Sequence, residues 1–194
     1  MDKKVDNKTK DNIDKNVVKS FGEEWTYFKQ DILPEKEELK LFNNYFKNFP
    51  FSQLNNDSVG FDLGCGSGRW AKHIAKKVGQ IICIDASTDS IEVAKKNLSS
   101  FSNCKFIVAS VDNIPIEKNS MDFGFSLGVL HHVPDPFEGI KSCVSKLKPG
   151  APFLVYLYYN LENRPIWYRI LWKLTDVVRT ITSVFPKRAK YVLS

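Results

Sequence analysis

The sequence predicts an α/β fold, a three-layer sandwich in which helices cover both faces of a mostly parallel central sheet. Two observations carry this prediction. Between residues 58 and 160, short apolar runs alternate with segments of helical periodicity. Several of these runs are apolar throughout, which is typical of strands buried on both faces. Strands that alternate with helices form βαβ units, and such units build a parallel sheet.

The length and composition fit about one soluble domain. The 194 residues are 43% hydrophobic and 26% charged, which excludes a disordered chain, a collagen and a small disulfide-stapled scaffold. The formal net charge is +6, and residues 161–194 alone hold seven basic and two acidic side chains. Because the body of the chain is close to neutral, we expect no nucleic-acid partner.

The N-terminal part precedes the sheet. Residues 1–20 alternate Lys, Asp and Asn and are expected to form a flexible basic tail. Residues 21–57 are expected to form an aromatic and helical segment, in which a helix follows Pro34. The apolar stripe of that helix consists of Leu39, Phe42, Phe46 and Phe49. The aromatic cluster before it fits either a lid over a ligand or plain packing, and it contains Trp25, Tyr27 and Phe28.

The sheet domain is expected to span residues 58–160. Its five predicted strands are Val59–Leu63, Gln80–Asp85, Lys105–Ala109, Met121–Leu127 and Phe153–Tyr159. The predicted helices are Arg69–Val78, a segment from Ser87 through Leu98, and Pro136–Leu147. Ser87 and Asp135 are residue types that cap helix N-termini, and the Pro149-Gly150 pair ends the last helix.

Residues 161–194 form a basic amphipathic segment that is expected to be helical over 166–185. Its apolar side fits packing on the domain, and its basic residues, spread over 164–190, also fit contact with a membrane surface or a partner. No apolar run approaches the ~18 residues of a membrane span, and residues 1–20 are too polar for a signal peptide. The cytoplasm is therefore the expected compartment.

A glycine-rich loop directly follows the first predicted strand. It has the sequence Asp62-Leu63-Gly64-Cys65-Gly66-Ser67-Gly68, and Asp85 ends the next strand. Glycines let the chain turn sharply and let a ligand approach main-chain amides. A carboxylate at the end of the second strand is placed to accept hydrogen bonds from two ribose hydroxyls. The loop and the acid together predict a nucleoside site.

Charge indicates which nucleoside this site binds. A dinucleotide fingerprint has a third glycine where Arg69 stands, and it holds a pyrophosphate over the loop, close to the carboxylate of Asp62. No Gly-Lys-Ser/Thr follows, which excludes a P-loop. S-adenosylmethionine carries a sulfonium and no phosphate, so it is favoured beside Asp62. An NAD(P)-dependent oxidoreductase remains an alternative.

These motifs resemble those of the class I S-adenosylmethionine-dependent methyltransferases, in particular the bacterial group often called type 11. The resemblance covers about half of the chain, from Val59 to Tyr159. The glycine loop is similar to the family's first motif, the run from Ile84 to Ser87 to its second, and the run from Met121 to Pro136 to its fourth. The resemblance implies a Rossmann-like fold and S-adenosylmethionine as the cofactor. The implied cofactor-binding residues are Asp62, Gly64, Cys65, Gly66, Ser67, Gly68, Asp85, Ala86, Ser110, Val111, Asp112 and Leu127.

Two features depart from the family pattern. Family members commonly carry Gly-Asp-Ala after the third strand, with the Asp on the adenine amino group, whereas Ala109-Ser110-Val111-Asp112 stands here. The Ser110 hydroxyl or the Asp112 carboxylate is expected to take that role. The family sheet normally has seven strands, and only five are predicted here. With the last two missing, the chain is either a reduced variant or a piece of a longer protein. We expect a piece of a longer protein, because an exposed apolar edge beside the fifth strand would favour aggregation.

A general base is needed only when the methyl acceptor carries a proton that must leave. His131 and His132 follow the fourth predicted strand, at the edge where open α/β sheets bind ligands. One of them is the candidate base, and the alternative is that both brace the next helix. The four cysteines form no CxxC pair, so no metal site and no disulfide framework are predicted.

The acceptor is expected to be a small molecule, a lipid or a saccharide. The Asn-Pro-Pro-Tyr type of motif found in amide and adenine N-methyltransferases is absent, and Leu127-Gly128-Val129-Leu130 occupies its position. A non-enzymatic alternative is a module or fragment that binds S-adenosylmethionine without turnover. The missing strands and Ser110 favour that alternative.

Overall fold

The computed structural model describes residues 11–27 and 34–158, together with positions 165–167, 170, 172 and 175. The chain divides into two compact units, Met1–Leu157 and Tyr158–Ser194. The first unit holds the sheet and every residue of the candidate site.

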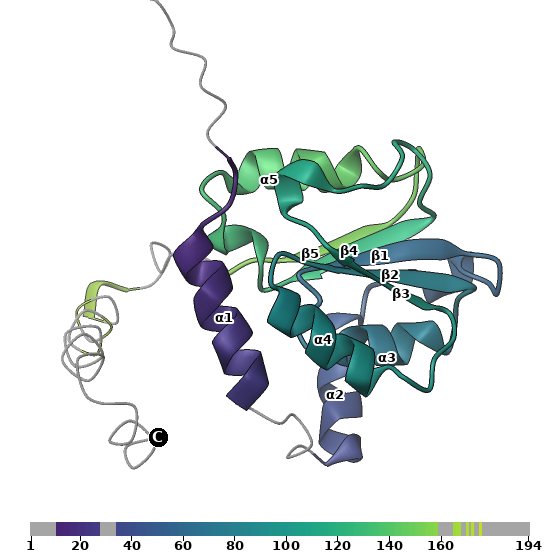
Figure 1. The fold of residues 1–194 in the computed structure, drawn as a ribbon, viewed down its shortest axis with the longest axis horizontal. Coiled ribbons are helices and arrows are strands. Elements are labelled where there is room, and N and C mark those ends of the chain that lie inside the picture. The colour runs from purple at the N-terminus through teal and green to yellow at the C-terminus, as the bar shows by residue number, and fades with distance from the viewer. Residues whose placement is uncertain are drawn as a thin grey trace, which may run out of the picture. The chain divides into compact units, whose positions relative to one another are not determined.

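The central sheet of the first unit has five parallel strands in the order β3-β2-β1-β4-β5 (Figure 1). The strands are β1 (Val59–Leu63), β2 (Gln80–Asp85), β3 (Cys104–Val108), β4 (Phe123–Leu127) and β5 (Phe153–Tyr156). The chain builds outward from β1 through β2 to β3, and then returns to the other side of β1 with β4. Such a reversal creates a crevice at the carboxyl ends of the strands, where open α/β sheets bind ligands.

Helices cover both faces of the sheet (Figure 1). One face carries α2 (Glu35–Tyr45), α3 (Arg69–Ala75) and α4 (Thr88–Asn97), and the other carries α5 (Pro136–Val144). Side chains alternate between the two faces along each strand. In β1, Phe61 and Leu63 join the core under α5, which directs Asp62 to the opposite face. The predicted α/β fold with a parallel sheet is confirmed.

The first helix differs from the sequence prediction. α1 (Lys15–Tyr27) begins inside the segment predicted as a tail over residues 1–20, and it packs against α4. Asp14 caps its start, because Oδ1 accepts the N–H groups of Asn16 at 2.9 Å and Val17 at 3.2 Å. Because residues 1–20 are mostly polar, their composition does not indicate a helix. Val17 and Val18 nevertheless line the candidate site, together with Phe21 from the next turn.

The predicted helix caps are present, and the element boundaries shift by a few residues. Ser87 Oγ accepts the N–H of Ser90 at 3.3 Å, and Asp135 Oδ1 accepts two amides in the first turn of α5. β4 begins at Phe123, two residues after the predicted start, because Met121 forms only an isolated bridge to Leu147. β5 ends at Tyr156, and the predicted end at residue 159 lies outside the described residues.

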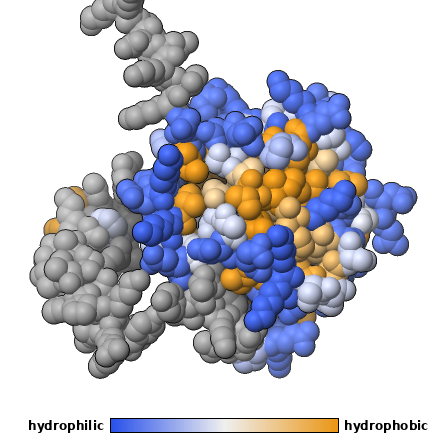
Figure 2. All heavy atoms as spheres, viewed as in Figure 1, coloured by the Kyte–Doolittle hydropathy of each residue, from blue (hydrophilic) through white to orange (hydrophobic). Residues whose placement is uncertain are grey.

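Apolar side chains are exposed in both units. Figure 2 shows an apolar band across the middle of the first unit, over β3 and its neighbours, where Val108 is 50% exposed. In the second unit Ile166 is 74% exposed and Trp167 is 66% exposed. Beyond these two residues, the structure describes the predicted 166–185 helix only at positions 170, 172 and 175. The side chains of the predicted lid residues Trp25, Tyr27 and Phe28 lie outside the described part. Among the described residues, no helix combines the length and the apolar character needed to cross a membrane.

Candidate cofactor site

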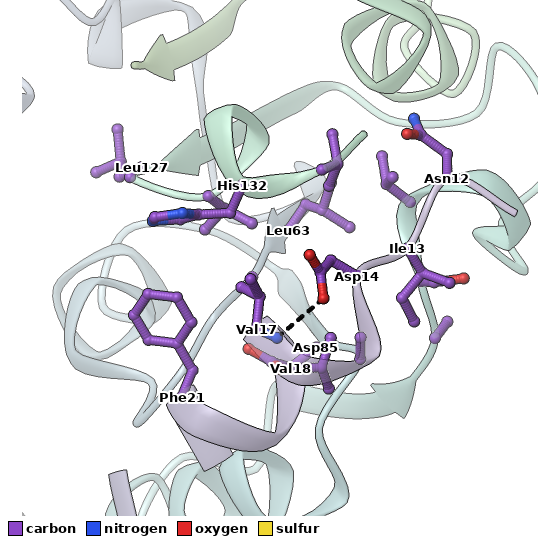
Figure 3. A pocket seen from close by; sticks show the side chains of 18 residues that line it. Asn12, Ile13, Asp14, Val17, Val18, Phe21, Leu63, Asp85, Leu127 and His132 are labelled. Carbon is purple, nitrogen blue, oxygen red and sulfur yellow. Dashed lines mark hydrogen bonds between the residues drawn. The ribbon is translucent and has the colours of Figure 1, made fainter. Parts of the chain in front are cut away.

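A cavity lies at the carboxyl edge of the sheet, beside the glycine loop (Figure 3). Its empty space, including the open mouth, is about 810 Å³. The segments that end the strands contribute Leu63, Gly64, Asp85, Ala86, Ala109, Ser110, Val111, Leu127, Gly128 and Val129. The turn after β4 adds His132 and Val133, and the N-terminal segment adds Asn12, Ile13, Asp14, Val17, Val18 and Phe21.

The glycine loop is fixed in place and requires glycine. The N–H groups of Gly64 and Cys65 both donate to the carbonyl of Ile84, at 2.7 and 3.0 Å, which ties the loop to β2. Gly64 has a φ of +75°, and a Cβ added there would lie 2.3 Å from Cγ2 of Val129. The backbone of the loop can therefore approach both Val129 and a ligand in the cavity, as no larger residue would permit.

Asp85 connects the loop to the end of β2. Its Oδ2 accepts the N–H of Gly66 at 3.0 Å, and its Oδ1 accepts the N–H of Ser87 at 2.9 Å. Burial raises the pKa of Asp85 above its ordinary value, and the two amides act in the opposite direction. The carboxylate also lines the cavity, where a ligand can reach it.

Asp62 is a buried carboxylate at the end of β1 and does not itself line the cavity. The residue is 1% exposed, and its Oδ2 has no hydrogen-bond partner among the described residues. Burial raises the pKa of Asp62 well above the usual carboxyl value, and the negative charge of Asp85 raises it further. A nearby positive charge would offset this unfavourable burial, whereas a pyrophosphate would add to it.

The residues after β3 form a connected group. Ser110 and Val111 line the cavity, and the Ser110 hydroxyl donates a short hydrogen bond to Oδ1 of Asp112. Oδ2 of Asp112 accepts the backbone N–H of Asn12 at 3.1 Å. Both oxygens of Asp112 therefore already have donors from the protein.

The two candidate histidines differ in position. His132 lines the cavity, and its ring centroid lies 5.0 Å from that of Phe21 (Figure 3). His131 does not line it, although the two imidazole centroids are 3.9 Å apart. Burial lowers the pKa of both rings, and the charge of His132 lowers that of His131 further. His73 lies elsewhere, with Nε2 2.7 Å from Oε1 of Glu38.

The structure brings together part of the predicted set. The predicted residues that line the cavity are Gly64, Asp85, Ala86, Ser110, Val111, Leu127 and His132. Those that do not are Asp62, Cys65, Gly66, Ser67, Gly68, Asp112 and His131. The sequence prediction missed the whole N-terminal wall, from Asn12 to Phe21. The sequence pattern that could have revealed this wall is the helix-capping residue Asp14, followed by apolar residues at helical spacing.

Comparisons with known proteins identify the family of the domain. Residues 61–155, about half of the chain, match the family described as a methyltransferase domain. The chain is 26% identical over 159 residues to a ubiquinone biosynthesis O-methyltransferase of Vibrio cholerae, a match that covers 80% of this chain and 63% of that protein. It is 35% identical over 105 residues to the protein of that name from Xanthomonas campestris, covering 53% of this chain and 42% of that one.

The fold is also similar to a solved structure, the N-methyltransferase NodS from Bradyrhizobium japonicum in complex with S-adenosylhomocysteine. The TM-score is 0.58 at 19% identity, and the match covers 71% of this chain and 72% of that one. The chain spans less than two thirds of the length of the curated relatives named above. With its glycine loop, the acid ending β2 and the matched domain, the chain belongs to the class I S-adenosylmethionine-dependent methyltransferases, in the type 11 group.

Proposed function

We propose that the chain transfers a methyl group from S-adenosylmethionine to a small-molecule acceptor. The observation that carries the proposal is that Gly64, at a positive φ, and Asp85 line the same cavity. The unpartnered Oδ2 of Asp62 lies buried at the same end of the sheet. This set fits an adenosyl cofactor that bears positive charge.

Each group of residues has a role in holding the cofactor. Asp85, which lines the cavity, accepts hydrogen bonds from the ribose hydroxyls. The glycine loop lies against the methionine part, and the Val111 amide serves an adenine ring nitrogen. When bound, S-adenosylmethionine supplies a methyl group already activated by the sulfonium, for in-line displacement, so the main contribution of the protein is positioning.

The acidic surroundings support a cationic cofactor over a nicotinamide dinucleotide. Asp62 and Asp85 interact closely enough for the charge of Asp85 to raise the pKa of Asp62. A sulfonium and an ammonium group relieve this repulsion between carboxylates, and a pyrophosphate placed over the loop adds to it. The two carboxylate charges therefore destabilise the ligand-free protein and strengthen binding of the proposed cofactor.

His132 is the proposed general base. Its ring lines the cavity beside Phe21, while that of His131 does not. Because burial lowers the pKa of His132, the imidazole is neutral at pH 7 and one ring nitrogen is available to take a proton from an acceptor hydroxyl. Phe21 and Val133 line the cavity with His132.

The lining favours an apolar acceptor that carries a hydroxyl group. Val17, Val18, Phe21 and Val133 face the cavity, and His132 supplies a base close to them. The name shared by the Vibrio and Xanthomonas relatives, ubiquinone biosynthesis O-methyltransferase, supports the same class of acceptor. We therefore propose a phenolic or lipid hydroxyl over a saccharide.

Contact with a membrane surface forms a separate part of the proposal. Ile166, Trp167 and Ile170 are exposed in the second unit, and basic residues alternate with this stretch in the sequence. Co-sedimentation of the full chain with vesicles of anionic lipid tests it. Binding that high salt weakens supports the contact, and equal recovery in the supernatant with and without vesicles removes it.

The test of the proposed activity is formation of S-adenosylhomocysteine from S-adenosylmethionine in the presence of catechol-type acceptors. Turnover by the wild-type chain and its loss in His132→Gln, with cofactor binding retained, support the proposal. Lys95→Gln changes an exposed residue on α4 and serves as the matched control. Cofactor binding without turnover of any acceptor supports the non-catalytic alternative instead.

A further inference from the structure

Three hydrogen bonds of Asn12, here called the latch, hold the N-terminal segment beside the cofactor cavity. The backbone N–H of Asn12 donates to Oδ2 of Asp112 at 3.1 Å, and Nδ2 donates to the carbonyl of Asp135 at 2.8 Å. The N–H of Asp135 returns a hydrogen bond to Oδ1 of Asn12 at 2.7 Å. These bonds join residues 100 and 123 positions apart, so residue 12 is fixed between the turn after β3 and the start of α5.

One of these three hydrogen bonds engages Asp112, an acid that the sequence predicts for binding the adenine. Asp112 accepts from Asn12 through Oδ2 and from the Ser110 hydroxyl through Oδ1, and it does not line the cavity. The hydroxyl proton of Ser110 is directed at Asp112. Ser110, at the position of the family's adenine-binding Asp, has no carboxylate, and the nearby carboxylate of Asp112 does not line the cavity.

A different carboxylate enters the cavity two residues after the latch. Asp14 lines the cavity, and Figure 3 shows its side chain among the lining residues. Its Oδ1 caps α1 by accepting the amides of Asn16 and Val17. Among the described residues, Oδ2 accepts no hydrogen bond, so the cap leaves one oxygen available to a ligand.

We propose that Asp14 accepts the 6-amino group of the adenine, in place of the acid that family members carry after the third strand. The inference rests on the proposed function. The adenosine half of the cofactor offers as donors its ribose hydroxyls, assigned to Asp85, and its amino group. A carboxylate only accepts hydrogen bonds, so Asp14 favours an amino group and disfavours a keto oxygen at the same position.

The test compares S-adenosylhomocysteine with S-inosylhomocysteine, in which a keto group replaces the amino group. Calorimetric titration of the full chain gives both dissociation constants. A hydrogen bond to a charged group predicts that the wild-type chain prefers the adenosyl compound by about 10- to 100-fold. Asp14→Asn keeps a residue that caps helices and can turn its NH2 toward a keto oxygen, so the preference falls by about 10-fold or more.

Two further variants keep the test decisive. Asp14→Ser also caps the helix but is too short to reach the amino group. It therefore weakens binding of the adenosyl compound, and it strengthens binding of the inosyl compound because the repulsion between the carboxylate and the keto oxygen is lost. Asp11→Asn is the matched control, because Asp11 is exposed and does not line the cavity. Circular dichroism of each variant checks that α1 still forms.

The outcomes separate this inference from the proposed function. A wild-type preference that collapses in both Asp14 variants and persists in Asp11→Asn supports it. If the adenosyl compound binds and the preference is the same in Asp14→Asn as in the wild type, Asp14 is not the adenine acceptor, and the proposed function stands without it. Absence of wild-type binding to either compound overturns both.

Discussion

The carboxylate of Asp85 accepts the backbone N–H of Gly66 at 3.0 Å, so the acid that ends β2 holds the loop that follows β1. The same side chain also accepts the N–H of Ser87 at the start of α4 and lines the cavity. Asp85 therefore supports the shape of the site, and in the proposed function it also accepts the ribose hydroxyls. Loss of this carboxylate removes both contributions.

Replacement of Asp85 by alanine is expected to weaken binding of S-adenosylhomocysteine by about 100-fold, because two charge-assisted hydrogen bonds are lost. Asp85→Asn retains one carbonyl acceptor, so its affinity for S-adenosylhomocysteine is expected to fall by less. Calorimetric titration measures both constants, with Glu92→Ala on the exposed side of α4 as the control. An unchanged constant in Asp85→Ala contradicts the assignment of the ribose to this residue.

Substitution of Gly64 and of Gly150 by alanine distinguishes the effect of backbone strain from that of a steric clash. Both have a positive φ, but an added Cβ meets Val129 at 2.3 Å in the first and nothing within 4 Å in the second. Gly150→Ala is expected to lower the free energy of unfolding by about 1–2 kcal/mol through its φ alone. Gly64→Ala adds a clash that costs about 1–3 kcal/mol more. Urea denaturation measures both, and equal losses would show that Val129 moves aside freely.

Asp62→Asn is expected to stabilise the ligand-free chain and to weaken its ligand binding. Burial raises the pKa of Asp62, so the ionised form is disfavoured in the folded state, and its cost is present at neutral pH and disappears as the pH falls through the raised pKa. Removal of the charge raises the free energy of unfolding at pH 7 by about 1 kcal/mol or more. The affinity for S-adenosylhomocysteine, which carries an ammonium group, falls in the same variant. A variant that is less stable and binds equally well would refute a role for this charge.

The three histidines of the chain are all expected to titrate below the ordinary value of about 6.5. Burial is the largest cause of the lowered pKa of His73, His131 and His132. Between about pH 6.5 and the lowered values the unfolded chain binds more protons, so each histidine weakens the fold as the pH falls through that window. NMR titration of the imidazole resonances measures the three values. A His132 that titrates above pH 7 would be mostly charged at neutral pH and unsuited to act as a base.

The sequence predicts the sheet better than it predicts the walls of the site. Strands such as Gln80–Asp85 and caps such as Ser87 depend on local patterns, and the structure contains both. The N-terminal wall depends on contacts between Asn12 and Asp135, 123 positions apart, which no local pattern encodes. The sequence also does not distinguish His131 from His132, because a single turn decides which ring reaches the cavity.

The central claim concerns the class of cofactor, and one pair of titrations tests it most directly. Calorimetric titration of the full chain with S-adenosylhomocysteine, and in parallel with NADH, measures binding to the cavity bounded by Gly64 and Asp85. We predict saturable binding of S-adenosylhomocysteine and none of NADH. Binding of NADH by a chain that does not bind S-adenosylhomocysteine would contradict the account.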